Sequence, residues 1–110
     1  MEITDDYMRS TMQKALPYTA VILHRTAAYG GDGTPAIIWE HGRRNMKLRA
    51  EGELVVVCPI KDATDVAGFG LFKGSVEQVE AILADDPAIQ AGVLRYEIHP
   101  TRSLIGASDI

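Results

Sequence analysis

Two residues of this chain, His41 and Asp86, have side chains and sequence neighbours that could support acid–base chemistry. Residues 35–51 show helical periodicity, and at about 100° per residue His41 shares one side of that helix with Ile38 and Leu48. A polar group that is buried without a partner costs about 1–3 kcal/mol. His41 therefore needs either a hydrogen-bonding partner or a cavity beside it.

Asp86 is the predicted partner of His41. It directly precedes a proline, so its carboxylate can cap a short helical turn. A carboxylate that is bonded to a histidine fixes the tautomer of the ring and supports its action as a general base or acid near neutral pH. We expect the two side chains to lie within hydrogen-bonding distance and to face a cavity beside a sheet. In the alternative interpretation, Asp86 only caps a helix and His41 is a fully bonded residue of the core.

Other residue types that could do chemistry are present, but their spacing is unfavourable. The histidines His24, His41 and His99 could ligate zinc together, yet their spacing fits no compact ligand motif, so no metal site is expected. Cys58 follows a run of valines and is expected to be a small buried apolar side chain, not a nucleophile. The glycine-rich residues 29–34 lack the lysine and the full spacing of a phosphate-binding loop. No cofactor is expected.

Composition narrows the class of protein. The chain has 110 residues, of which 46% are hydrophobic and 24% charged, as in a soluble globular domain. Its net charge of −4 argues against nucleic acid as a partner, because phosphate contacts need a basic face. A single cysteine excludes an internal disulfide and makes a reducing, cytoplasmic setting the default expectation. The acidic N-terminus does not resemble a signal peptide, and the apolar runs are too short for a membrane span, so no membrane partner is expected.

The elements that must position these side chains follow from periodicity and from turn residues. Helices are predicted at residues 4–15, 35–51 and 75–84, and strands at residues 18–25, 53–60, 66–73 and 93–99. Thr34 is expected to cap the second of these helices, and Pro100 to end the last strand. From residue 18 on, the order strand, helix, strand, strand, helix, strand predicts an α+β, ferredoxin-like fold with an antiparallel four-stranded sheet. The predicted parts are an N-terminal helical arm (1–16), the domain (17–102) and a C-terminal tail (103–110).

Two features of the predicted sheet bear on partners and ligands. The strand at residues 53–60 is apolar on both faces and lies at an edge of a ferredoxin-like sheet, so both of its faces should be covered. A second copy of the chain, packed sheet to sheet, would cover it, and we therefore expect a homodimer. Gly68 and Gly70 share one face of the next strand, which indicates a bulge or a tight helix contact, or else room for a ligand.

Several stretches together resemble the YciI-like (YCII) family of dimeric α+β barrels. They are His41 to Gly52, the Cys58-Pro59 step, Asp86-Pro87-Ala88-Ile89-Gln90-Ala91-Gly92-Val93, and Glu97-Ile98-His99-Pro100. The similarity extends over residues 17–102, and its most specific part is the Asp-Pro stretch. The chain departs from the family pattern at Ile38, where an arginine is frequent, at Cys58, where glycine is usual, and at Ala88, where an aromatic residue is usual.

The resemblance implies a ferredoxin-like protomer that dimerises through its sheets, with a pocket that holds a His–Asp pair. His41 matches the family histidine and Asp86 the family aspartate. One branch of the family removes chloride from a chlorinated hydroxyhydroquinone. The implied function is that of a lyase or isomerase that acts on a small, aromatic or lactone-like molecule without a cofactor. The alternative is a non-catalytic, ligand-binding or regulatory dimeric module.

Overall fold

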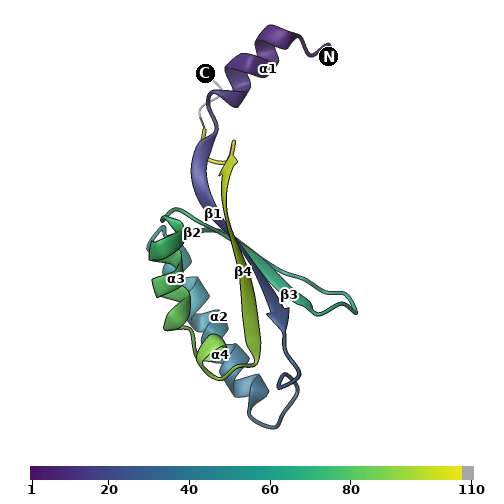
Figure 1. Cartoon of the computed structure of the whole chain (residues 1–110), viewed down its shortest axis with the longest axis vertical. Coiled ribbons are helices and arrows are strands. Elements are labelled where there is room, and N and C mark those ends of the chain that lie inside the picture. The colour runs from purple at the N-terminus through teal and green to yellow at the C-terminus, as the bar shows by residue number, and fades with distance from the viewer. Residues whose placement is uncertain (108–110) are drawn as a thin grey trace.

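The chain folds into an α+β domain with a helical arm at one end (Figure 1). The computed structural model describes residues 1–107, so residues 108–110 of the predicted C-terminal tail lie outside the described part. The elements are α1 (Asp5–Met12), β1 (Leu16–Arg25), α2 (Thr34–Ala50), β2 (Leu54–Pro59), β3 (Val66–Phe72), α3 (Val76–Ala84), α4 (Pro87–Gln90) and β4 (Leu94–Ser103).

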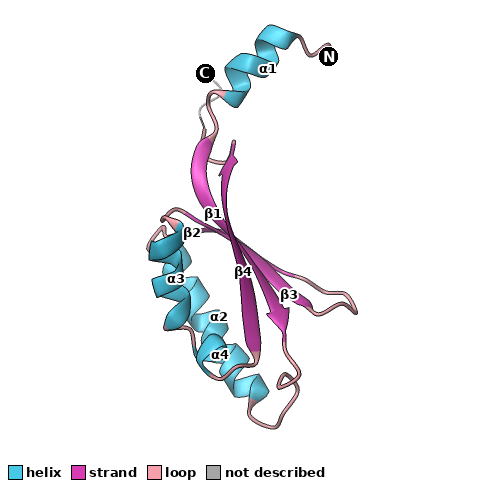
Figure 2. Ribbon diagram, viewed as in Figure 1, coloured by secondary structure: helices cyan, strands magenta, loops and turns pink. Residues whose placement is uncertain are grey.

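The four strands form one sheet in the order β2-β3-β1-β4, and all neighbouring strands are antiparallel. Helices α2, α3 and α4 lie together on one face of this sheet, and no helix within residues 1–107 covers the other face (Figure 2). The predicted antiparallel four-stranded α+β architecture is confirmed, and it is consistent with a ferredoxin-like fold. Strand β2 lies at the edge of the sheet, as expected.

The core fills the space between the sheet and the helices. One buried cluster joins the strands to α3 and consists of Val21, Leu54, Phe72, Val79 and Leu83. A second cluster surrounds α4 and the start of β4, and it consists of Ala88, Val93 and Leu94, with Ile37 and Ile38 of α2 packed against it. This second cluster holds α4 against α2 and so determines where the N-terminus of α4 lies.

A single chain covers only one face of β2, and the expected cover of the other face by a second copy stays a prediction. Leu54, which faces the helices, is buried, but Val56 is only half-buried and Cys58 is exposed. Cys58 pairs with Phe69 on the helix-free face, so it is not the buried apolar side chain that the sequence indicated. The valine-rich pattern therefore reflects an apolar surface on the helix-free face of β2, and this surface stays partly exposed in a single chain.

Strand β4 runs through Pro100 to Ser103, past its predicted end. Because β4 is an edge strand, the missing N–H of Pro100 can fall on the side that has no neighbour. Pro100 stands opposite Thr19 in the pairing with β1, which continues to Leu16 and Ser103. The result is a two-stranded ribbon that extends beyond β3, whose pairing with β1 reaches only to Thr19.

The ends of helices α1 and α2 differ in part from those expected. Gly52 follows α2 with a φ of +82°, the left-handed conformation in which glycine commonly ends a helix. However, Thr34 does not cap α2, because Gly33 is its N-cap and makes no side-chain capping bond. The Thr34 hydroxyl instead accepts a hydrogen bond from the Gly30 N–H at 3.2 Å. Helix α1 ends at Met12, three residues before its predicted end.

Candidate functional site

His41 and Asp86 meet where α2 packs against the N-terminus of α4. The distance from His41 Nδ1 to Asp86 Oδ2 is 2.7 Å, which confirms the predicted contact. Asp86 is also the N-cap of α4, since its Oδ1 accepts a hydrogen bond from the Ala88 N–H at 2.8 Å. The aspartate is only 1% exposed. One carboxylate therefore caps α4 and also orients the His41 ring, so the predicted helix cap and the predicted contact with His41 are both present.

Asp86 is held in its ionised form by its neighbours. Burial acts to raise the pKa of the Asp86 carboxyl, but the hydrogen bond and charge of His41 oppose it, as do the Ala88 N–H and the Arg44 guanidinium. The net pKa of Asp86 lies below its ordinary value. Arg44 Nη1 lies 4.0 Å from Asp86 Oδ2, is buried, and makes no hydrogen bond. Arg44 lies three residues after His41 on α2, and this spacing brings its head group near the same carboxylate.

The other ring nitrogen of His41 meets Asn45, one helical turn further along α2. The distance from Asn45 Nδ2 to His41 Nε2 is 3.2 Å. Because ionised Asp86 can only accept, His41 Nδ1 donates its proton, and the lone pair of the neutral ring is then on Nε2. The sequence gave no role to Asn45, although its i, i+4 spacing from an inward-facing histidine was the available signal.

A cavity of about 420 Å³ lies beside this pair, between α2 and the sheet. His41, Asn45 and Asp86 contribute polar groups to its wall, while most of the wall is apolar and includes Leu23, Ile38, Leu54 and Val57. A volume in this range suits a small organic molecule. The predicted cavity beside the sheet is thus present, and the histidine lines it.

Gly68 and Gly70 are buried in β3 and line the same cavity. A Cβ atom on Gly70 would lie 3.2 Å from the Phe72 ring and 3.3 Å from the Leu54 side chain, and one on Gly68 would lie 3.2 Å from the Cys58 carbonyl oxygen. The two glycines therefore allow close packing and leave space on the helix side. A register shift between Leu23 and His24 opposite them is the bulge that their pattern indicated.

Arg25 lines the cavity at the end of β1. Its Nη1 donates hydrogen bonds to the carbonyl oxygens of Thr64 and Val66, each at 3.0 Å, and its guanidinium lies 5.4 Å from the centre of the Tyr29 ring. Arg25 thus fixes the β2–β3 loop to β1 and places a positive charge at the cavity.

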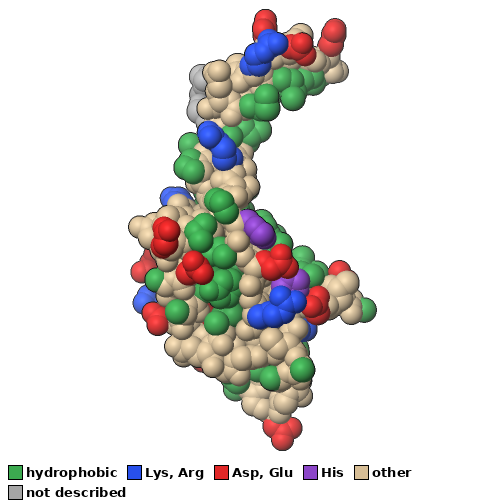
Figure 3. Space-filling model, in the orientation of Figure 1, with side chains coloured by type: hydrophobic (Ala, Val, Ile, Leu, Met, Phe, Trp, Pro, Cys, Tyr) green, Lys and Arg blue, Asp and Glu red, His purple; other side chains and the backbone are tan. Residues whose placement is uncertain are grey.

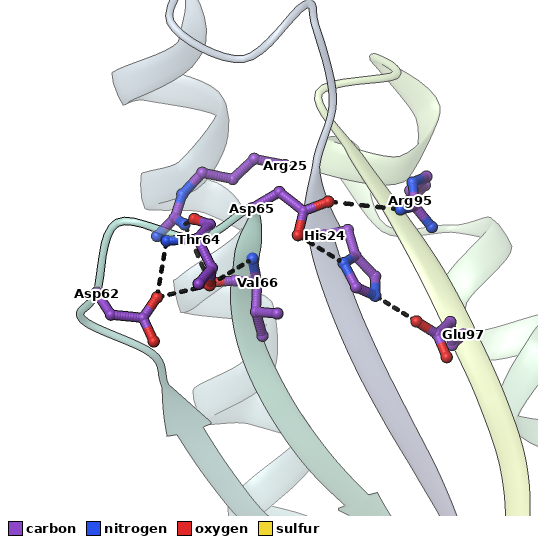
Figure 4. A network of polar contacts seen from close by, with 8 residues as sticks. All are labelled: His24, Arg25, Asp62, Thr64, Asp65, Val66, Arg95 and Glu97. Carbon is purple, nitrogen blue, oxygen red and sulfur yellow. Dashed lines mark hydrogen bonds and ion pairs between the residues drawn. The ribbon is translucent and has the colours of Figure 1, made fainter.

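A second polar cluster joins β1, β4 and the β2–β3 loop (Figure 4). His24 Nε2 lies 2.5 Å from Glu97 Oε1, and His24 Nδ1 lies 3.3 Å from Asp65 Oδ1, too poorly aligned for a hydrogen bond. Asp65 also pairs with Arg95 at 3.5 Å. The hydrogen bond from His24, together with the His99 ring 3.6 Å away, lowers the pKa of Glu97 below its ordinary value. This cluster ties three segments together at one end of the sheet.

The histidines that the sequence considered together are therefore separated. His24 and His99 pair with residues on the helix-free side of the sheet, whereas His41 belongs to the helix layer. Within residues 1–107, no group of three or more His, Cys, Asp or Glu side chains is placed to hold a metal ion.

Comparison of the chain with family models and with curated proteins finds no match in either case. None of the helices within residues 1–107 has the length and apolar character needed to cross a membrane. The His41–Asp86 pair and the cavity that it borders are the features of this chain that indicate a function.

Proposed function

We propose that this chain is a YciI-like enzyme that moves a proton on a small molecule, as a lyase or isomerase, with His41 and Asp86 as its catalytic pair and no cofactor. One observation supports the proposal above all. A buried, ionised aspartate is bonded at 2.7 Å to a histidine on the wall of a cavity of about 420 Å³. A core histidine with a purely structural role has no need of the adjoining cavity.

In the proposed reaction, His41 Nε2 is the atom that exchanges a proton with the substrate. Asp86 accepts the Nδ1 hydrogen, which keeps the ring oriented and stabilises the imidazolium that forms when Nε2 takes up a proton. Asn45 can donate to the lone pair of the neutral ring, and after rotation of its amide it can accept from the protonated ring. A bound molecule would compete with Asn45 for Nε2.

The cavity wall determines the class of molecule that fits. Its mostly apolar lining favours a flat aromatic or lactone-like ring, and Arg25 offers a positive charge for a phenolate or carboxylate group. This ligand class agrees with the substrates that the family resemblance implies.

We also propose that the protein is a homodimer that packs sheet to sheet, as in a dimeric α+β barrel. The helix-free face of the sheet carries Ile22, Val56 and Phe69, which are only half-buried. Apolar side chains on an open sheet face favour association, and two sheets can pack about 10 Å apart. A second copy of the same sheet would cover them.

The proton-transfer proposal is tested by deuterium incorporation. Small phenols, aromatic acids and lactones are first screened for binding by ligand-observed NMR, and each binder is then incubated with the protein in D₂O. We expect catalysed exchange or conversion of at least one binder, and we expect His41→Asn to slow this rate roughly 10²-fold or more while the compound still binds. Glu40→Gln is the control, because Glu40 is exposed on the same helix and pairs with Arg43 away from the cavity and from the sheet.

Two results would contradict the proposal that this protein is an enzyme. Binding without exchange in the wild-type protein would indicate the alternative, a non-catalytic ligand-binding module. An exchange rate that is unchanged in both His41→Asn and Asp86→Asn would show that neither side chain takes part in the reaction.

A further inference from the structure

Helix α1 stands away from the domain at the end of the β1–β4 ribbon (Figure 1). It is eight residues long, and none of its residues is buried. Isolated helices shorter than about 12–15 residues are only marginally stable in water. The N-terminal cap of Thr4, whose side chain accepts from the Tyr7 N–H, is a small contribution to its stability. A helix of this length needs a packing partner, and its own domain does not provide one.

The exposed side of α1 that lacks a partner is apolar. Ile3, Tyr7, Met8 and Met12 are between 45% and 58% exposed. At helical spacing Tyr7, Met8 and Met12 fall on one side of α1, while Asp5, Asp6 and Arg9 fall on the other. Ile3 precedes the helix. In the space-filling view, hydrophobic side chains gather along the inner side of the arm (Figure 3). The arm leans towards the side of the molecule opposite α2 and α3, which is the side that no helix covers (Figure 1).

The direction of the arm is set by bonds at its base. Arg102 Nη2 donates to the Ala15 carbonyl oxygen at 2.9 Å, and the Lys14 N–H donates to the Thr11 carbonyl oxygen at 3.0 Å. From Leu16 onwards the chain is paired with β4. The apolar side of α1 is therefore presented in a defined direction, beyond the reach of the core of its own chain.

We infer that α1 packs against a second copy of this chain, so that each subunit of the homodimer is clasped by the arm of the other. The inference rests on the sheet-to-sheet dimer of the proposed function and adds a second, separate contact to it. A partner on the helix-free face lies on the side towards which the arm leans. In a two-fold dimer the contact occurs twice, and one partner covers both the open sheet and the apolar side of α1.

The charges of the arm argue against two other occupants. Within the arm, residues 1–16, the acidic side chains of Glu2, Asp5 and Asp6 outnumber the basic ones of Arg9 and Lys14. The arm therefore lacks the basic cluster that anionic lipid headgroups and nucleic-acid phosphates bind. A protein surface with an apolar groove is the complementary partner.

The first test measures the dissociation constant of the dimer by sedimentation at a series of concentrations. A triple variant, Tyr7→Ser with Met8→Ser and Met12→Ser, should raise this constant roughly tenfold or more, because three apolar side chains leave the contact. The matched control, Asp6→Ser with Gln13→Ser, changes the other side of the same helix and should leave the constant within about twofold of wild type. All of these residues are exposed, so circular dichroism should show an unchanged domain.

The second test asks which chain the arm contacts. A spin label is attached at Asp5→Cys, on the polar side, in a Cys58→Ser background, and this chain is mixed with an isotope-labelled Cys58→Ser chain that carries no spin label. We expect broadening of amide signals of the isotope-labelled partner.

The outcomes distinguish the contact made by α1 from the sheet-to-sheet contact. If Ile22→Glu dissociates the dimer while the triple variant leaves its dissociation constant unchanged and no broadening occurs between chains, the arm contact is overturned and the sheet contact stands. A wild-type chain that remains monomeric would overturn both. Neither result bears on proton exchange at His41, which is measured separately.

Discussion

The buried carboxylate of Asp86 is ionised in the native fold, so the stability of the fold should depend on pH in the acid range. Because its pKa is lowered in the folded chain, the unfolded chain binds the proton more readily. The stabilisation is fully present above the ordinary pKa of an aspartate, about 3.9, and is lost as the pH falls through the lower folded value.

We therefore predict that the free energy of unfolding falls as the pH drops below about 4, and that Asp86→Asn removes part of this dependence. The amide can still cap α4, but its N–H would face His41 Nδ1 and favour the opposite tautomer. Urea unfolding between pH 2 and 7 measures the effect, with Asp5→Asn on the exposed surface of α1 as the control for the change of charge. An acid dependence identical to that of the wild type would contradict the prediction.

The sequence located the His41–Asp86 pair because each residue had a local signal. Helical spacing turned His41 inward, and a following proline marked Asp86 as a cap. Arg44 and Glu97 had no such signal. Their partners are determined by side-chain directions or by strand register across the fold, and neither is encoded in a short window of sequence.

At the scale of elements, α3 has the most complete cap of the domain. The Ser75 hydroxyl accepts from the Gln78 N–H at 3.2 Å, and the Gln78 side chain accepts from the Ser75 N–H at 2.9 Å, which together form a capping box. We predict that Ser75→Ala lowers the free energy of unfolding by about 1 kcal/mol. Ser10→Ala, inside α1, is the control, because alanine favours a helix interior and no cap is lost there. Thermal unfolding followed by circular dichroism compares them, and equal melting temperatures for both variants would refute the role of the cap.

Most strands and helices could be predicted from the sequence because hydrophobic periodicity reflects which side faces the core. Their ends were less predictable where tertiary context overrides a local rule. Pro100 is tolerated within β4 because its missing N–H can face the outer edge of the sheet, and Thr34 bonds to the preceding loop although its type suits an N-cap.

At the scale of the whole molecule, the open sheet face should determine the state of assembly. We predict by light scattering a mass of about twice 12.0 kDa for the wild-type protein, and a mass near that of one chain for Ile22→Glu. A glutamate at this position would place an unpaired charge between two sheets. Ala81→Glu, on the exposed side of α3, is the control and should remain dimeric. A dimeric Ile22→Glu variant would show that the sheets are not the interface.

The sequence predicted an apolar edge strand and, from it, a cover on both faces. The structure provides that cover on the helix side only, since Leu54 is buried while Val56 is half-buried and Cys58 is exposed. Periodicity reports which residues avoid water, but it does not say whether the same chain or another one shields them.

The long pairing of β1 with β4 also has a consequence for how the protein is made. Ala15 and Arg102 meet although 87 residues separate them, and the strands between them pair along ten positions. During synthesis β1 leaves the ribosome well before β4, and the edge of β1 that pairs with β4 has no neighbour until β4 has followed. The sheet therefore closes late, with a high cost in loop entropy, and folding should be slow for a domain of this size. Until β4 arrives, the free edge of β1 is a surface on which other nascent chains could pair.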